Sequence, residues 1–145
     1  MGKVIQFETG LQEFTLNSAV TVYFNPTDTA FINRVFDSVE LLDAKENEYQ
    51  AALDGMEDNA QVFELASAHN AEIREVINGI FGDDVCTPLF GDMDASALAD
   101  GLPVWANLIM AIIDTFDDEF AQEKKKKNPR LAKYTAKYSN RAKAK

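Results

Sequence analysis

The spacing of the apolar residues changes once along the chain, from two to about 3.6, and this change sets the class of fold. In residues 3–25 apolar and polar positions alternate, and the turn residues Thr9-Gly10 and Asn17-Ser18 divide them, which predicts two or three antiparallel strands. From Asn25-Pro26-Thr27-Asp28 onward the spacing is helical, with Asn25 predicted as the cap and Pro26 as the first helical residue. We therefore expect an α+β protein in which a small N-terminal antiparallel β segment packs on a helical bundle.

Two apolar stripes of similar length follow, joined by a short turn at Gly55, and they predict a helical hairpin. Asp58 is the expected cap of the second helix. The stripes are Val35, Val39, Leu42, Tyr49, Leu53 and Met56 in the first helix, and Phe63, Ala66, Asn70, Ile73, Ile77 and Ile80 in the second.

Each stripe contains a polar break, and the hairpin brings the two breaks together. Pairing outward from the turn places Glu46 opposite His69 and Lys45 opposite Asn70. Such polar contacts fix the register of a helix pair at some cost in stability. An acid/base pair is the catalytic interpretation of Glu46 and His69, but a satisfied polar contact is the simpler one, and we adopt it.

The last helix of the body is the most hydrophobic part of the chain. Residues 83–103 are irregular, and Pro103 then begins a helix whose apolar residues cover a wide face. This width predicts a helix at the centre of the bundle. The apolar residues are Trp105, Leu108, Ile109, Ile112, Ile113, Phe116 and Phe120, with Met110 and Ala111 on the remaining side.

The acids Asp92, Asp94 and Asp100 have the spacing of ligands for a hard cation. They do not complete an EF-hand loop, because Ala97 stands where glycine is required and Pro103 where the bidentate acid belongs. We predict instead that Asp94 caps a helix.

The remaining residues with chemical potential form no recognisable active site. Asp114, Asp117 and Asp118 share a helix face, but no Glu-x-x-His accompanies them, so we predict a solvated acidic face. The chain has one cysteine, Cys86, and one histidine, His69, and it has no phosphate-binding or dinucleotide-binding glycine motif. We expect no metal, no cofactor and no enzymatic activity.

Charge divides the chain into two parts. The last 22 residues hold 10 of the 14 basic residues and no acid, whereas residues 1–123 hold all 24 acidic residues and four basic ones, a formal charge of −20. Such an asymmetry concerns partners more than fold. We therefore divide the protein into an acidic α+β domain, 1–123, and a basic C-terminal arm, 124–145.

The arm is a helical or disordered segment with three possible partners: nucleic acid, an acidic membrane surface or an acidic protein surface. Its apolar face is thin for a membrane, and a body of charge −20 repels nucleic acid, so a protein partner, such as the body of a neighbouring copy, is favoured. The candidate partner-binding residues are Lys124, Lys125, Lys126, Lys127, Arg130, Lys133, Tyr134, Lys137, Tyr138 and Arg141.

The sequence predicts a soluble, cytoplasmic protein. Glu8 and Glu13 follow a short alternating stretch at the N-terminus, which lacks the basic flank and long apolar core of a signal peptide. The most apolar run, 102–113, is about half the length that crosses a bilayer. One cysteine gives no sign of an oxidising compartment.

Four stretches of the chain resemble the tail assembly chaperones encoded by siphophages and prophages of Gram-positive bacteria. They are VTVYFNPTD (20–28), FGDM (90–93), LPVW (102–105) and NPRLAKYTAKY (128–138), and an acidic helical middle accompanies them. The resemblance implies a non-enzymatic protein of the host bacterial cytoplasm that forms homo-oligomers. It also implies binding to the tape measure protein and other tail proteins, which keeps the long hydrophobic helices of the tape measure soluble during tail assembly.

Members of this family are often made in a short and a longer form by ribosomal frameshifting. The lysines at 124–127 must be encoded by an A-rich stretch, which raises the hypothesis of a frameshift here. The alternative to a chaperone is a small nucleic-acid-binding accessory protein that uses the arm.

Overall fold

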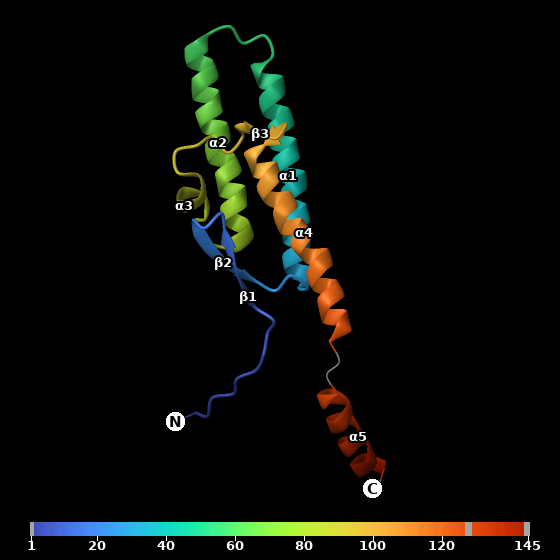
Figure 1. Ribbon diagram of the computed structural model, residues 1–145. Coiled ribbons are helices and arrows are strands. Elements are labelled where there is room, and N and C mark those ends of the chain that lie inside the picture. Colours follow the sequence, from blue (N-terminus) through green and yellow to red (C-terminus); the bar gives the residue numbers. More distant parts are fainter. Residues whose placement is uncertain (1, 127–128, 144–145) are drawn as a thin grey trace.

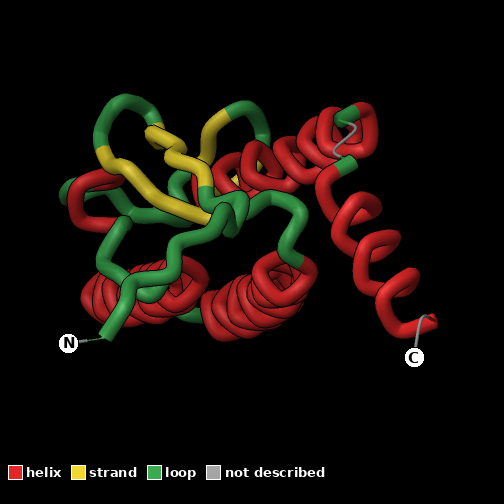
Figure 2. Tube along the Cα trace, turned by 90° about the horizontal axis from the view of Figure 1, so that it is seen from below, coloured by secondary structure: helices red, strands yellow, loops and turns green. Residues whose placement is uncertain are grey.

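The expected α+β architecture is confirmed by the structure, a computed structural model that describes residues 2–126 and 129–143, and the side chains of 2–126 and 129–137. Helices α1 and α2 form one layer, and α4, the β1–β2 hairpin and an irregular segment lie over it, while α5 stands beyond the end of α4 (Figures 1 and 2). The elements are β1 (Gln12–Leu16), β2 (Val20–Phe24), α1 (Thr29–Leu53), α2 (Asn59–Phe81), α3 (Cys86–Phe90), β3 (Leu98–Ala99), β4 (Leu102–Pro103), α4 (Val104–Lys125) and α5 (Arg130–Lys143).

The β1–β2 hairpin forms where the alternating pattern predicts it. Asn17 and Ser18 have φ angles of 49° and 56°, and the Ala19 N–H donates to the Leu16 carbonyl at 2.9 Å, which closes the turn. The register pairs Gln12 with Phe24 and Leu16 with Val20. Alternate residues of β2 face inward, so that Val22 and Phe24 are buried while Thr21 and Tyr23 are exposed.

The alternating residues before Gly10 do not form a strand, so the sheet has two strands and not three. Gly10 has φ +74°, and the Asn25 side chain donates to the Thr9 carbonyl at 2.9 Å, so the chain bends at this point and residues 2–9 run away from the hairpin (Figure 1). Val4, Ile5 and Phe7 are left 78–85% exposed.

The first helix begins three residues later than the sequence suggests. Asp28 is its N-cap and accepts from the Ala30 N–H at 3.0 Å, whereas the Asn25 side chain accepts from the Thr27 N–H within the preceding turn. The predictions that Asn25 caps α1 and that Pro26 is its first residue are therefore wrong. Asp58 caps α2 as predicted, since its side chain accepts from the Ala60 N–H.

The α1–α2 hairpin is confirmed, but its second stripe is shorter than predicted. Ile73, Ile77 and Ile80 are fully buried, whereas Phe63 is 74% exposed. The reason is geometric: the ends of α1 and α2 that meet at the 54–58 turn extend past the start of α4, so the second layer does not cover them (Figure 1).

Helix α4 packs on the other layer with one face. Trp105, Ile109, Ile112 and Phe116, spaced by three and four residues, are buried. Met110 is 47% exposed and Ala111 is exposed as well. One face of α4 therefore belongs to the core, and in the described part of the chain the opposite face is exposed.

An aromatic cluster joins the hairpin to both helical layers. The Phe24 ring stacks on Phe14 with centroids 4.3 Å apart and on Phe31 at 4.5 Å, and Phe116 meets Phe31 edge-on at 6.1 Å. Pairs of this kind contribute about 0.5–1.5 kcal/mol beyond the area they bury. The two-stranded sheet, which would be marginal alone, is stabilised in this way by α1 and α4.

The core assignment is tested by truncating one buried and one exposed apolar residue on α2. Ile73→Ala removes a fully buried side chain and is expected to lower the free energy of unfolding by about 2–5 kcal/mol. Phe63→Ala is the control and is expected to change it by less than about 0.5 kcal/mol. Urea unfolding followed by fluorescence of the single, buried Trp105 measures both. Equal losses would contradict the exposed position of Phe63.

Candidate functional site

The basic arm, residues 124–145, divides between the end of α4 and the separate helix α5. Lys124 and Lys125 form the last turn of α4, and Lys126 is its C-cap and pairs with Glu123 at 2.9 Å. The predicted boundary between 123 and 124 thus falls within a helix. Cations in this last turn interact favourably with the negative end of the helix dipole.

Helix α5 carries the rest of the predicted partner-binding residues. Its side chains are exposed over the described residues 130–137, including Lys133, and Arg130 lies over the Tyr134 ring at 5.8 Å. Leu131, one turn from Tyr134, is 74% exposed. Lys127 lies outside the described residues, and so do the side chains of Tyr138 and Arg141.

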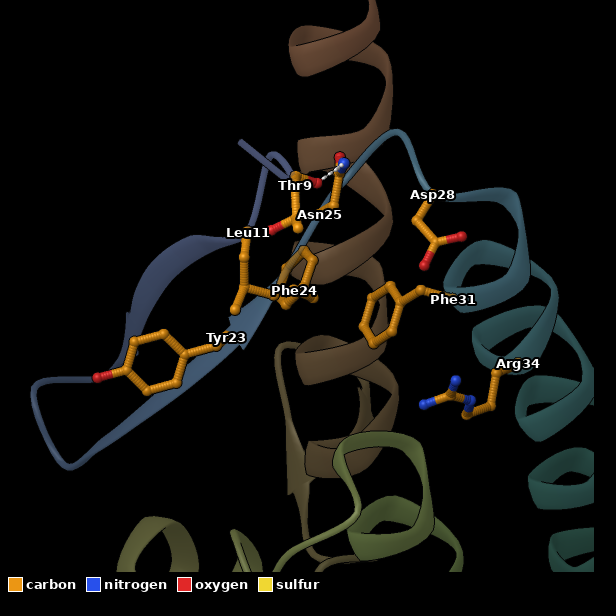
Figure 3. Close-up of a pocket in the computed structure, with 8 residues that line it drawn as sticks. All are labelled: Thr9, Leu11, Tyr23, Phe24, Asn25, Asp28, Phe31 and Arg34. Atoms are coloured by element: carbon orange, nitrogen blue, oxygen red, sulfur yellow. Dashed lines mark hydrogen bonds between the residues drawn. The ribbon is translucent and has the colours of Figure 1, made fainter. Parts of the chain in front are cut away.

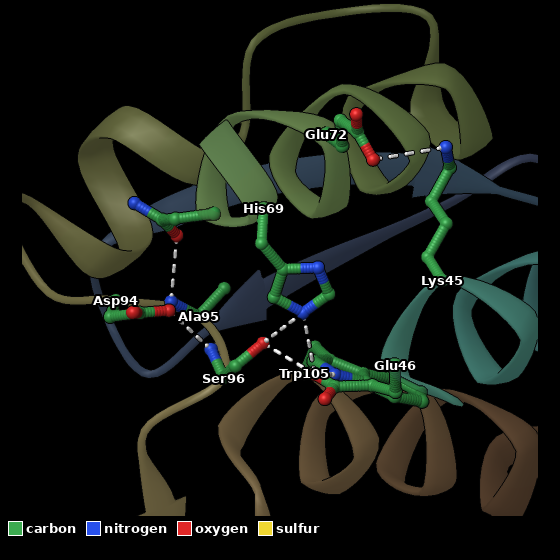
Figure 4. A network of polar contacts seen from close by, with 9 residues as sticks. Lys45, Glu46, His69, Glu72, Asp94, Ala95, Ser96 and Trp105 are labelled. Carbon is green, nitrogen blue, oxygen red and sulfur yellow. Dashed lines mark hydrogen bonds and ion pairs between the residues drawn. The ribbon is translucent and has the colours of Figure 1, made fainter. Parts of the chain in front are cut away.

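A polar cluster inside the body joins four elements at one carboxylate oxygen (Figure 4). The predicted contact between Glu46 and His69 is confirmed, with Nε2 of His69 3.1 Å from Oε1 of Glu46. The Ser96 hydroxyl donates to the same oxygen at 2.5 Å and the Trp105 indole N–H at 2.9 Å. The cluster therefore ties α1, α2, the irregular segment and α4 together.

The geometry of the cluster differs from that of a Ser-His-acid catalytic triad. In a triad the acid and the serine contact opposite nitrogens of the imidazole. Here the Ser96 hydroxyl and the Glu46 carboxylate both lie at Nε2 of His69, at 3.2 and 3.1 Å, and the hydroxyl donates to the carboxylate itself. The imidazole is 4% exposed and stacks on Tyr49 at 4.1 Å. The arrangement is suited to holding elements together.

Burial and hydrogen bonding act on Glu46 in opposite directions. Burial by itself raises the pKa of its carboxyl, but the hydrogen bonds from Ser96, Trp105 and His69 favour the ionised form, and together they lower the pKa below its ordinary value. The ionised carboxylate is thus part of the folded structure.

A second set of polar side chains, of which the sequence pointed only to Asn70, holds the segment 83–97 against α2. Asn70 accepts from the Ala95 N–H at 2.9 Å. The Arg74 guanidinium donates to the carbonyls of Gly91 and Met93, both at 2.6 Å. Lys45, which was expected opposite Asn70, pairs with Glu72 instead at 3.3 Å, so that prediction is wrong because the Asn70 amide binds Ala95.

Asn78 lies one turn after Arg74 and belongs to the same polar stripe on α2, which consists of Asn70, Arg74 and Asn78. Its side-chain oxygen accepts from the N–H groups of Val85 and Cys86, at the start of α3, at 2.9 and 3.0 Å. Asn70, Arg74 and Asn78 are spaced by four residues, which places them on one face of α2. This spacing of polar residues was visible in the sequence and is the signal that could have revealed the stripe.

The acid-rich loop has a structural role in the described chain. The Asp94 side chain accepts from the Ser96 N–H at 2.8 Å, but a turn and then strand β3 follow, so the prediction that Asp94 caps a helix is wrong. Within the described residues, no group of three or more His, Cys, Asp or Glu side chains is placed to hold a metal ion.

A depression of about 440 Å³ lies where the N-terminal segment, β2 and α1 meet (Figure 3). Phe24 and Phe31 lie beside it, and the Arg34 guanidinium at its rim already donates to the Ile80 carbonyl at 3.0 Å. Arg34 therefore stabilises the C-terminal end of α2, where the last carbonyls of a helix lack partners.

Comparison with known proteins gives no match: no family model fits the chain, and no curated protein or solved structure proves similar to it. Among the helices in the described ranges, none is long and apolar enough to cross a membrane.

The lowered pKa of Glu46 predicts a loss of stability in acid. A carboxyl with a depressed folded-state pKa contributes stability that is present above its unfolded pKa of about 4.3 and is lost as pH falls through the folded value. The stability advantage of the wild type over Glu46→Gln is therefore expected to shrink as pH falls below about 4.3. Urea unfolding across pH 3–7 measures it, and the exposed Glu48→Gln is the control. A constant difference would show that the ionised form has no special role.

Burial raises the pKa of the Cys86 thiol to about 11. Because the thiolate is the reactive form, native Cys86 is expected to react with a thiol reagent at pH 8 far more slowly than the unfolded chain. Absorbance with an aromatic disulfide reagent, with and without denaturant, measures the two rates. Equal rates would contradict both the burial of Cys86 and its raised pKa.

Proposed function

We propose that this protein is a non-enzymatic assembly chaperone of a phage tail, which self-associates and binds the tape measure protein and other tail proteins. The observation that carries the proposal is the separation of charge in space. Helix α5 presents exposed cations apart from a body of charge −20, as a segment that binds an acidic protein surface would.

The resemblance of the four sequence stretches to tail assembly chaperones supplies the identity of the client. A tape measure protein is long and helical, and a chaperone that keeps it soluble needs apolar as well as charged surface. This chain offers both, since Val4, Ile5 and Phe7 of the N-terminal segment and Met110 of α4 are exposed on a body of charge −20.

Self-association is supported by the same exposed apolar residues. The N-terminal segment runs clear of its own body, so residues 2–9 are available to a neighbouring copy. Monomeric soluble proteins rarely leave such a run uncovered.

The chaperone role is tested by co-expression with the neighbouring tail genes. Affinity capture of the full-length protein is expected to retain the tape measure protein and to increase its soluble fraction. The triple variant Arg130→Glu, Lys133→Glu, Lys137→Glu is expected to lose most of this retention, whereas the charge-conserving variant Arg130→Lys, Lys133→Arg, Lys137→Arg keeps it. A full-length protein that neither retains nor solubilises the tape measure would refute the proposal.

Nucleic-acid binding is the alternative use of the arm, because it combines tyrosines with many cations, and Arg130 lies over the Tyr134 ring. It predicts binding to generic DNA that weakens steeply as salt rises. We expect no measurable shift of a fluorescent DNA duplex at low salt, since the acidic body repels it. Salt-sensitive DNA binding that the triple arm variant abolishes would instead favour the accessory protein.

A further inference from the structure

An apolar groove of about 300 Å³ lies on the exposed side of α4. Its walls are Leu16 at the end of β1, Leu89 and Phe90 of α3, and Leu108 and Ala111 of α4. No charged side chain lines it, in contrast to the rest of this acidic body.

The groove continues into an acidic helix face. Asp114 and Asp118 lie three and seven residues after Ala111, so they follow it on the same side of α4, and Asp117 lies beside them. All three carboxylates are exposed. This surface of α4, from Leu108 to Asp118, is thus apolar at one end and negative at the other, and we name it the α4 face.

We propose that the α4 face of one copy binds helix α5 of a second copy. Helix α5 has a matching pattern, because Leu131, Tyr134 and Lys137 follow one another at three-residue spacing, and Arg130, which lies over the Tyr134 ring, adds a further positive charge. Leu131 and Tyr134 occupy the groove, and Lys137, flanked by Lys133, meets Asp114 and Asp118. This docking rests on the self-association in the proposed function and names the surfaces that produce it.

The lengths of the two surfaces agree. From Leu131 to Lys137 an α-helix rises about 9 Å, and from Leu108 to Asp114 it rises about 9 Å as well, so that Leu131 and Tyr134 lie at Leu108 and Ala111 of the groove. A parallel arrangement of the two helices therefore brings the apolar and the charged parts into register at the same time.

In this parallel register the arm of the same copy cannot place Leu131 in the groove while both helices are intact. Leu108 lies about 26 Å along the helix from Lys125, the last residue of α4. From Lys125 to Arg130, where α5 begins, five Cα–Cα steps span at most about 18 Å. Leu131, the next residue, therefore falls short of Leu108, and a second copy supplies the helix in this arrangement.

The contact joins two different surfaces, so it is heterologous. Each copy offers one α5 and one α4 face, and successive copies form a closed ring or an open filament according to the rotation between them. Because the attraction between exposed charges is screened, the assembly is expected to grow with protein concentration and to shrink with added salt.

Charge exchange tests the docking. The arm variant carries Arg130→Glu, Lys133→Glu and Lys137→Glu, and the face variant carries Asp114→Lys, Asp117→Lys and Asp118→Lys. Sedimentation velocity at low salt is expected to show association of the wild type and at least a tenfold weaker association of each variant alone. An equimolar mixture of the two variants is expected to associate again, because each arm then meets a face of opposite charge.

Two controls make the result specific. A chain with all six changes is expected to self-associate like the wild type, which also shows that the changes permit folding. The variant Asp37→Lys, Glu40→Lys, Asp43→Lys makes the same change of charge on exposed residues of α1, away from the groove, and is expected to associate normally.

The proposal is overturned if the wild type stays monomeric at every concentration, if the mixture fails to associate, or if the α1 variant loses association as fully as the face variant. Capture of the tape measure protein by the six-fold variant separates the two proposals. If the six-fold variant self-associates but does not capture the tape measure protein, the docking is supported and the chaperone role of the arm is refuted. If a monomeric protein captures the tape measure protein, the chaperone role is supported and the docking is refuted.

Discussion

The carboxylate of Glu46 is the contact on which the arrangement of the body depends. One oxygen of this side chain is hydrogen-bonded by Ser96, Trp105 and His69. Through these three contacts α1 is joined at one point to the irregular segment, to α4 and to α2. Apolar packing alone tolerates slippage, but a partly buried carboxylate that loses its hydrogen-bond donors is destabilised. The cluster therefore fixes the register of the α1–α2 hairpin and the place of α4 on it.

The polar side chains of α2 extend this control to residues 83–97, which are irregular apart from the short helix α3. Asn70, Arg74 and Asn78 satisfy backbone groups of residues 83–97, which makes few ladder hydrogen bonds of its own. That segment in turn carries Ser96 to Glu46 and places Leu89 and Phe90 beside α4. The groove on α4 is thus a consequence of how α2 holds this segment, and α3 forms one of its walls.

Much of this architecture was predictable from the sequence. The change of period separated the hairpin from the helices, Asp58 marked the start of α2, and pairing outward from the turn brought Glu46 to His69. The start of α1 and the burial of Phe63 were not predicted correctly, the number of strands was left at two or three, and the exposure of one face of α4 was not foreseen. The start of α1 depends on the local turn that the Asn25 side chain holds, whereas the exposure of Phe63 and of one face of α4 depends on how elements distant in sequence pack.

The sequence by itself determined the class of fold, the helical hairpin with its polar contact, and the division into an acidic body and a basic arm, because these follow from periodicity and charge along one chain. Only the tertiary structure decided that Ser96 and Trp105 complete the Glu46 cluster. It also decided that one face of α4 stays uncovered between the apolar groove and Asp118. Contacts of this kind join residues many positions apart, and their geometry arises only when the layers pack.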